Sequence, residues 1–271
     1  MSAWISPAQA AEAMERGDGR GVRVAVLDSG IETSHPYFSG RHLHDDLVSE
    51  ANGNFQPGSG EDLYGHGTAV AGIIWKLAPK AEIGSFRVLG SSLSARTAQV
   101  SVAARRCIAL GYQVLNCSFG CGISGHLPLY KEWVDSALLS GIHVVAASGS
   151  ADVSEWPAHL SSVLGVDCAL SNEGGLRHLP GRIVEFAAPA AGIRVPWKQG
   201  GHRVMTGSSF AAAWLSGMLA RLISIYPDVD PFLAKSLLRR LAGEGMEGLR
   251  DGSKGERQPF YLPNLKPSAS Q

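Results

Sequence analysis

Short runs of hydrophobic residues recur along the chain. The runs are continuous rather than alternating, which is typical of strands buried on both faces of a sheet. The first run stops directly before Asp28, so a carboxylate follows a predicted strand. The predicted strands are Val22–Leu27, Ala81–Val88, Gln113–Phe119, Ile142–Ala147, Ser162–Val166 and Arg182–Ala187.

Segments with helical periodicity separate these runs. In Thr97–Leu110 the apolar positions share one face, and Gly111 supplies a stop signal. Leu129–Ser140 and Phe232–Ala242 follow the same pattern. Because strands alternate with helices, the pattern favours a mainly parallel sheet with helices on both faces. We therefore predict a three-layer α/β fold.

The domain organisation is simple. The chain has no internal repeat and no convincing boundary, so residues 1–248 are predicted to form one domain. The last stretch is rich in Gly, Pro, Ser and charged residues, which is typical of a loosely packed segment. Residues 249–271 are therefore predicted to be a C-terminal tail.

Composition narrows the function classes. Lys plus Arg and Asp plus Glu both number 24, so there is no basic surplus that would indicate a nucleic-acid partner. Met1–Gly21 has no long apolar run, so neither a signal peptide nor a membrane-spanning helix is predicted. The four cysteines lie mostly in apolar stretches, which favours free thiols in a reducing compartment. These features predict a cytoplasmic protein without a membrane partner.

Three segments carry candidate chemistry. Asp28 ends a buried strand, His66 lies between two glycines at a predicted helix start, and Ser209 opens a long apolar helix. Taken singly, a strand-end Asp can cap a turn and a helix-start Ser can be a simple N-cap. Taken together, they supply a nucleophile, a base that removes its proton, and a carboxylate that orients the base. They are predicted to be a catalytic triad.

The residues around these three positions resemble the subtilisin-like (subtilase) family, and the likeness runs from about Val22 to Ala242. The order Asp, His, Ser is that of subtilisin. The sequence lacks the G-x-S-x-G motif that would indicate a lipase or esterase. The matching motifs are Asp28-Ser29-Gly30, His66-Gly67-Thr68-x-Val70-Ala71-Gly72 and Gly207-x-Ser209-x-Ala211.

The resemblance implies a subtilisin-like fold and a peptide-binding groove, in which substrate adds as a strand between two edge segments. It also implies a primary side-chain pocket walled by a segment that follows a strand. The residues implied for substrate binding are Leu93, Ser94 and Ala95; Ser118, Phe119 and Gly120; and Ala147, Ser148 and Gly149.

Several positions depart from the family pattern. The position of the family's oxyanion Asn holds Ser150, whose shorter hydroxyl predicts a weaker oxyanion donor. The Pro that stands four residues after the nucleophile in the family is Ala213 here, and the loop that often binds calcium in secreted relatives is missing. We therefore expect no metal and no cofactor. The pocket loop is shortened, which puts Glu155 near the pocket base and Asp152 near its rim, where a carboxylate would favour Lys or Arg.

The sequence thus predicts a serine endopeptidase that forms an acyl-enzyme on Ser209 and processes a specific peptide or precursor. His35-Pro36-Tyr37-Phe38 and Gly207-Ser208-Ser209-Phe210 add a modest likeness to cyanobactin-type maturation proteases. Two alternatives stay open: a transpeptidase or macrocyclase that uses the same acyl-enzyme, and a degenerate module that binds peptides without cleaving them. The sequence does not predict an oligomeric state.

Overall fold

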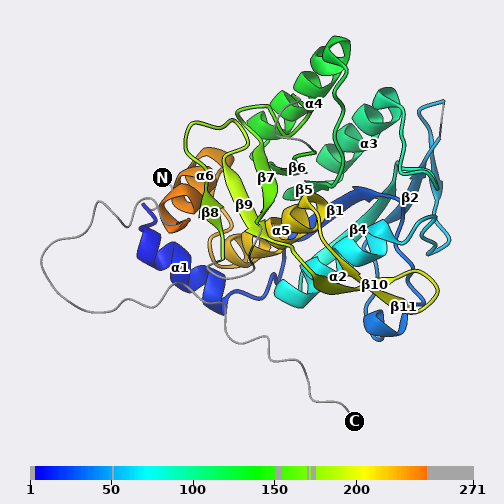
Figure 1. The fold of residues 1–271 in the computed structure, drawn as a ribbon, viewed down its shortest axis with the longest axis horizontal. Helices are drawn as coiled ribbons and strands as arrows, with labels where there is room; N and C mark the ends of the chain where they lie inside the picture. Colours follow the sequence, from blue (N-terminus) through cyan, green and yellow to red (C-terminus); the bar gives the residue numbers. More distant parts are fainter. Residues whose placement is uncertain (1–3, 51, 150–153, 170, 172–174, 243–271) are drawn as a thin grey trace, which may run out of the picture.

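The computed structural model describes residues 4–50, 52–149, 154–169, 171 and 175–242. The predicted tail, 249–271, lies outside the described residues, as do Ser150 and Asp152. Within the described residues, nine strands form one sheet in the order β3-β2-β4-β1-β5-β6-β7-β9-β8 (Figure 1). The strands are β1 Arg23–Asp28, β2 Asp46–Ser49, β3 Phe55–Pro57, β4 Glu82–Arg87, β5 Val114–Cys117, β6 His143–Ala147, β7 Leu164–Ala169, β8 Arg177–His178 and β9 Phe186–Pro189.

The sheet is parallel from β2 to β9, and each edge strand, β3 and β8, is antiparallel to its neighbour. Because parallel strands end at the same edge, the residues that follow β1, β5 and β6 are brought together there. A separate antiparallel hairpin consists of β10, Ile193–Trp197, and β11, Gly201–Met205. The hairpin directly precedes the helix that begins at Ser208.

Helices cover both faces of the sheet (Figure 1). Four of them belong to one buried cluster with the sheet, whereas two others pack on the opposite face in a second cluster. The first four are α1 Pro7–Arg16, α2 His66–Leu77, α5 Ser208–Ile225 and α6 Pro231–Leu241; the other two are α3 Thr97–Ala109 and α4 Leu127–Leu139. Two short 3-10 turns, η1 Pro36–Phe38 and η2 Ser124–His126, lie in loops.

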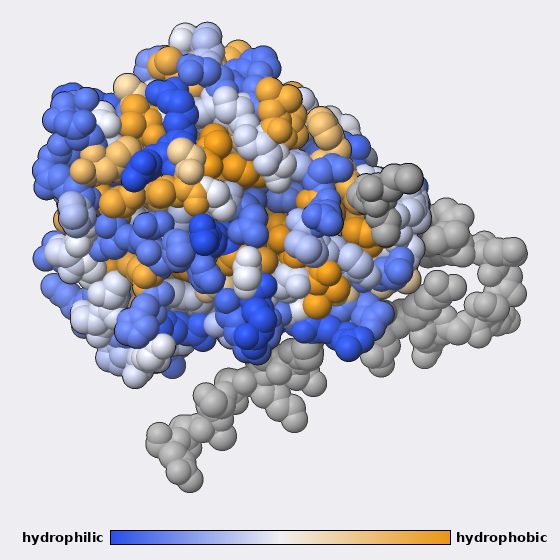
Figure 2. All heavy atoms as spheres, turned by 180° about the vertical axis from the view of Figure 1, so that it is seen from behind, coloured by the Kyte–Doolittle hydropathy of each residue, from blue (hydrophilic) through white to orange (hydrophobic). Residues whose placement is uncertain are grey.

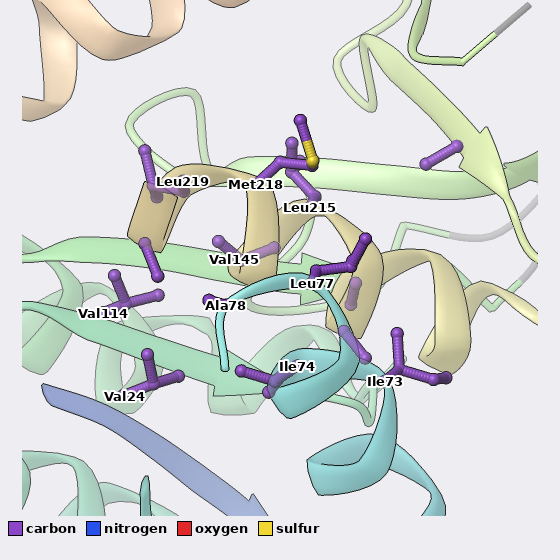
Figure 3. Packing of buried hydrophobic residues seen from close by; sticks show 14 of the residues in the cluster. Val24, Ile73, Ile74, Leu77, Ala78, Val114, Val145, Leu215, Met218 and Leu219 are labelled. Carbon is purple, nitrogen blue, oxygen red and sulfur yellow. The ribbon is translucent and has the colours of Figure 1, made fainter. Parts of the chain in front are cut away.

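The centre of the larger cluster is the contact between α2, α5 and the sheet. Figure 3 shows side chains from all three meeting there, among them Ile74 and Leu77 of α2, Leu215 and Met218 of α5, and Val145 of β6. Gly217 allows the two helices to approach closely, because a Cβ at this position would lie 2.9 Å from the Cβ of Leu77. This packing fixes α2 and α5, the two helices that carry His66 and Ser209.

Helix α5 is long and apolar enough to cross a membrane by length and composition, but 67% of it is buried inside the protein, as in a core helix. On the face seen in Figure 2, hydrophobic residues form small groups separated by hydrophilic ones. Such a mixture is ordinary for the surface of a globular protein.

The fold prediction is confirmed: the sheet is mainly parallel, and helices lie on both sides. The predicted strand over Arg182–Ala187 is partly wrong, because the strand begins only at Phe186. The preceding residues form a turn through Gly181, whose φ is +71°, and this turn is closed by a hydrogen bond from the amide of Leu179 to the carbonyl of Glu185. Helix α1 was not predicted, although a capping box of Ser6 and Gln9, with Pro7 at the first helical position, marks its start.

Candidate active site

Asp28 and His66 form a buried hydrogen-bonded pair. Nδ1 of His66 lies 2.9 Å from both carboxylate oxygens of Asp28. The carboxylate also accepts the amide hydrogen of Ser29, at 2.7 Å, and Asp28 is 1% exposed. With the Nδ1 proton donated to Asp28, Nε2 of the neutral ring is left as a proton acceptor.

Asp62 organises the start of α2, and the sequence reasoning missed it. Its Oδ1 accepts hydrogen bonds from the Ser29 hydroxyl at 2.7 Å and from the amides of Tyr64 and Gly65 at 2.9 and 2.7 Å. Its Oδ2 accepts the amide and the hydroxyl of Thr68 at 2.8 and 2.6 Å. An Asp shortly before a helix is an N-terminal capping signal, which could have indicated this role.

These carboxylates set the protonation of His66. Burial by itself lowers the pKa of His66, but the charge and hydrogen bond of Asp28 and the charge of Asp62 outweigh it. The pKa is therefore raised above its ordinary value of 6.5. A higher pKa makes the ring a stronger base, at the cost of a larger protonated fraction near neutral pH.

Ser209 lies in the first turn of α5, next to the end of β5. Its hydroxyl donates to the carbonyl of Ser118 at 3.2 Å, and the hydroxyl of Ser118 donates to the carbonyl of Ser209 at 3.1 Å. The ring of the next residue, Phe210, packs against the ring of His66 with centroids 5.4 Å apart. The first turn of α5 thus contacts both the end of β5, through Ser209, and the ring of His66, through Phe210. The Ser209 hydroxyl points to the Ser118 carbonyl, so it must turn to reach Nε2 of His66.

The segments implied for substrate binding flank this centre. The first segment, Ser118 to Gly120, follows β5. In the second, Ala147 ends the neighbouring strand β6, and Ser148 and Gly149 come directly after it. Ala147 and Ser148 are buried, whereas Gly120 and Gly149 are exposed. The two glycines therefore form the part of these segments that a ligand can reach.

Glu155 lies between the two glycines. Its Oε2 accepts the amide hydrogen of Gly149 at 2.7 Å, and a Cβ at Gly120 would lie 2.6 Å from the same oxygen. A pair of backbone hydrogen bonds, both 3.0 Å, joins Cys121 to Trp156 and holds Glu155 beside Gly120. The Glu155 carboxylate thus occupies a slot between Gly120 and Gly149, the exposed glycines of the two segments. Of the predicted pocket residues, Asp152 lies outside the described residues.

A cavity of about 530 Å³ opens beside this slot. It lies between Leu93, Ser94 and Ala95 on one side and Phe119 and Gly120 on the other. Leu93 has a φ of +56°, a conformation that is unusual for a residue with a branched side chain. The predicted edge segments are therefore brought together around a single cavity.

Three further expectations concern Ala213, Ser150 and a metal site. Ala213 is fully buried within α5, where a small helix-forming residue fits the packing. Ser150, the predicted oxyanion donor, lies outside the described residues. Across the part of the chain that the structure describes, no three His, Cys, Asp or Glu side chains gather as metal ligands would.

Comparisons with known proteins agree with this geometry. The sequence profile of the Subtilase family matches residues 19–258. Subtilisin DY of Bacillus licheniformis is 30% identical over 242 residues, which cover 83% of this chain and 84% of the relative. Subtilisin E of Bacillus subtilis (strain 168) is 32% identical over 225 residues, or 77% of this chain, but the match spans only 57% of that relative.

The similarity extends to solved structures. A cold adapted subtilisin-like serine proteinase superposes with a TM-score of 0.68 and 27% identity, covering 84% of this chain and 83% of the other. Three observations thus agree: the ordered Asp, His and Ser segments, the mainly parallel sheet that brings them together, and a family match over most of the chain. The chain belongs to the subtilase family.

Proposed function

We propose that the protein is a serine endopeptidase in which Ser209 is the nucleophile, His66 the general base and Asp28 the residue that orients the base. The observation that carries this proposal is the buried hydrogen bond from Nδ1 of His66 to Asp28, which leaves Nε2 free to accept a proton. The family relatives named above include subtilisins, and a subtilisin-like serine proteinase shares the fold.

In the proposed reaction the Ser209 hydroxyl turns from the Ser118 carbonyl towards Nε2 of His66. The hydroxyl oxygen attacks the peptide carbonyl while its proton passes to the ring, and Asp28 stabilises the imidazolium that forms. The ring then protonates the leaving amine. Water attacks the acyl-enzyme in a second step, so each peptide bond that breaks consumes one water molecule.

The N-terminus of α5 supports the developing negative charge. Ser209 is in the first turn of this helix, where backbone N–H groups have no intrahelical partner and the helix dipole is positive. The second donor that we expect is Ser150, where a hydroxyl replaces the family's amide. A weaker donor predicts slower turnover, and losing one oxyanion donor outright costs about 10²–10³ in rate.

We propose that the substrate has Lys or Arg before the cleaved bond. The Glu155 carboxylate lies in the slot between Gly120 and Gly149, where a cationic side chain would meet it directly. A charge-assisted pair inside a slot contributes more than one on an open surface. An apolar side chain would instead have to displace the carboxylate from the Gly149 amide, which adds a cost that a basic residue avoids.

A selective slot fits an enzyme that processes a particular peptide or precursor. The first of the two segments that suggested a likeness to cyanobactin-type proteases, residues 35–38, has a packing role here. His35 is buried, its Nε2 lies 2.8 Å from the Gly201 carbonyl, and Phe38 is buried against Trp75. The proposal of precursor processing therefore rests on Glu155 and not on that motif.

The proposed activity is tested with a fluorophosphonate probe, which reacts only with an activated serine. We expect labelling of the protein, none of Ser209→Ala, and labelling at least a hundredfold slower for Asp28→Asn. A protein that is not labelled, or is labelled equally as Ser209→Ala, would contradict the peptidase proposal and favour a peptide-binding module. Adding an amine nucleophile to the peptide assay distinguishes hydrolysis from transpeptidation, because transfer gives a joined product.

The proposed specificity is tested with peptides that differ only in the residue before the cleaved bond. We expect kcat/KM for Arg and Lys to exceed that for Leu or Phe by at least tenfold. Glu155→Gln keeps a hydrogen-bond acceptor for Gly149 but removes the charge, so the preference should fall to near unity. Glu132→Gln, an exposed carboxylate on α4, is the matched control. An unchanged preference in Glu155→Gln would overturn the assignment.

A further inference from the structure

A thiol and an imidazole lie together on the wall of the groove, away from the triad. Sγ of Cys121 is 3.7 Å from Nδ1 of His126, within hydrogen-bond range for sulfur. The hydroxyl of Thr97 is 2.9 Å from the same nitrogen and 3.9 Å from the sulfur. Because a hydroxyl can donate or accept, Thr97 can support the ring in either protonation state.

The same three side chains line the cavity beside the groove. The cavity volume, about 530 Å³, falls in the range of small-molecule sites. Among its described lining residues are one permanent cation, Arg96, and no carboxylate. Arg96 can therefore pair with an anionic group held in the cavity.

The other cysteines provide a comparison. All four are free, but Cys107 and Cys117 are fully buried in the core. Burial raises the pKa of both thiols, which makes them unreactive. Cys168 is half-buried like Cys121, but its sulfur lies 3.5 Å from the carbonyl of Ala169, and burial raises its pKa as well. Among the four, and within the described part of the chain, Cys121 alone has an imidazole within hydrogen-bonding distance and a cavity at its side.

We infer that Cys121 is a site of mixed-disulfide formation with a small anionic disulfide, and that the adduct blocks the substrate groove. This inference about the groove rests on the proposed peptidase function. His126 takes the proton of the Cys121 thiol, and the thiolate attacks one sulfur of the disulfide. The old S–S bond breaks as the new one forms, and the leaving thiolate recovers the proton from the ring.

The adduct would occupy the space between the two substrate-binding edges. Cys121 directly follows Gly120, and the cavity that its side chain lines is also lined by Leu93, Ser94 and Ala95. A group held there would compete with the part of a peptide that precedes the cleaved bond. A thiol reductant would break the mixed disulfide and free the groove, so the inhibition would be reversible.

Oxidised glutathione, a disulfide with several carboxylates, is a suitable probe. We expect peptide mapping by mass spectrometry to place one glutathionyl group on Cys121, formed at least tenfold faster than on Cys168. Peptidase activity should fall in step with this modification and return with dithiothreitol. Cys107 and Cys117 report unfolding, since only an opened core would expose them.

Variants separate the sites. Cys121→Ser should keep its activity in oxidised glutathione, Cys168→Ser should behave as the parent does, and His126→Asn should be modified more slowly. Equal modification rates at Cys121 and Cys168, or complete modification of Cys121 without loss of activity, would overturn the inference. A protein that is inactive on peptides but selectively modified at Cys121 would contradict the peptidase proposal and support the thiol site.

Discussion

Ser118 and Ser209 form a reciprocal pair of hydrogen bonds across the active site, in which the hydroxyl of each residue donates to the main-chain carbonyl of the other. Ser118 also accepts a hydrogen bond from the side-chain amide of Asn116, at 2.9 Å, and Asn116 in turn accepts from Ser216 inside α5. Strand β5 and helix α5 are thus joined by a chain of buried polar groups that begins at the proposed nucleophile. A satisfied buried network of this kind fixes one arrangement of the two elements.

Ser118→Ala should therefore affect both stability and the nucleophile. It removes one hydrogen bond to Ser209 and leaves the Asn116 donor without its buried acceptor, which predicts a loss of about 1–3 kcal/mol in the free energy of unfolding. Urea unfolding measures the loss, and the rate of fluorophosphonate labelling should fall as well. Ser136→Ala is the control. It removes an exposed hydroxyl that donates to the main-chain carbonyl of Glu132, and it should change the free energy of unfolding by less than about 0.5 kcal/mol. Equal effects of both substitutions would show that the Ser118 hydrogen bonds do not stabilise the protein more than an exposed hydroxyl does.

Asp62 should influence the pH dependence of activity. His66 must be neutral to accept the Ser209 proton, and its pKa is raised above 6.5 partly by the charge of Asp62. Activity should thus be lost as pH falls through that raised value, and Asp62→Asn should move the acidic limb of kcat/KM to lower pH. Asp135→Asn, on the exposed face of α4, should leave the limb unchanged. A limb that does not move in Asp62→Asn would mean that Asp62 acts only as a helix cap.

Gly67→Ala should disturb the approach of α2 to β1. A Cβ at this position would overlap the carbonyl oxygen of Gly30 and lie 3.1 Å from the Cβ of Asp28. We expect a loss of about 1–3 kcal/mol in stability, as for other overpacked sites, together with slower labelling of Ser209. Gly125→Ala is the matched control, since a Cβ there would have no neighbour within 4 Å. Thermal unfolding of both variants gives the comparison, and equal melting temperatures would contradict the prediction.

His143 should make stability depend on pH. Nε2 lies 3.0 Å from the Val229 carbonyl, Nδ1 has no partner in the described structure, and burial lowers the pKa to about 4. Between about pH 6.5 and 4 the unfolded chain therefore binds this proton more readily, so stability falls as pH decreases through that window. The loss can reach about 3 kcal/mol.

Urea unfolding of the parent protein and of His143→Gln at pH 7.5 and pH 4.5 isolates this contribution. The glutamine can still donate to Val229 but does not titrate. The parent should therefore lose more stability than the variant on acidification. If both lose the same amount, His143 is not the group responsible.

The sequence predicted the parts of the fold that depend on continuous burial. Most residues of β1, β4, β5 and β6 are buried on both faces of the sheet, so these strands form largely apolar runs that can be recognised from the sequence. The β10–β11 hairpin was missed because most of β11 is exposed and its residues are mixed in character. Its pairing depends on the turn at Gln199 and Gly200 and on packing against α2.

The site was predictable to the same limited degree. Asp28, His66 and Ser209 stood out because each occupies a distinctive strand end or helix start. Asp62 offered only the weaker signal of an Asp before a helix, because its link to the Ser29 hydroxyl, 33 positions away, forms only in the folded loop. The pairing of Cys121 with His126 likewise depends on the path of the chain after β5, and nothing in the spacing of these two residues indicates it.

The central position of α5 has a consequence for synthesis of the protein. This helix packs against β5, β6, β7 and β9 as well as α1 and α2, so the core stays open until its last turn, near Ile225, is available. A chain emerging from the ribosome exposes Asp28 and His66 early, but Ser209 joins them only when most of the sequence has been translated. Nascent chains that lack α5 should therefore be proteolytically inert, and termination before this helix would release no active fragment.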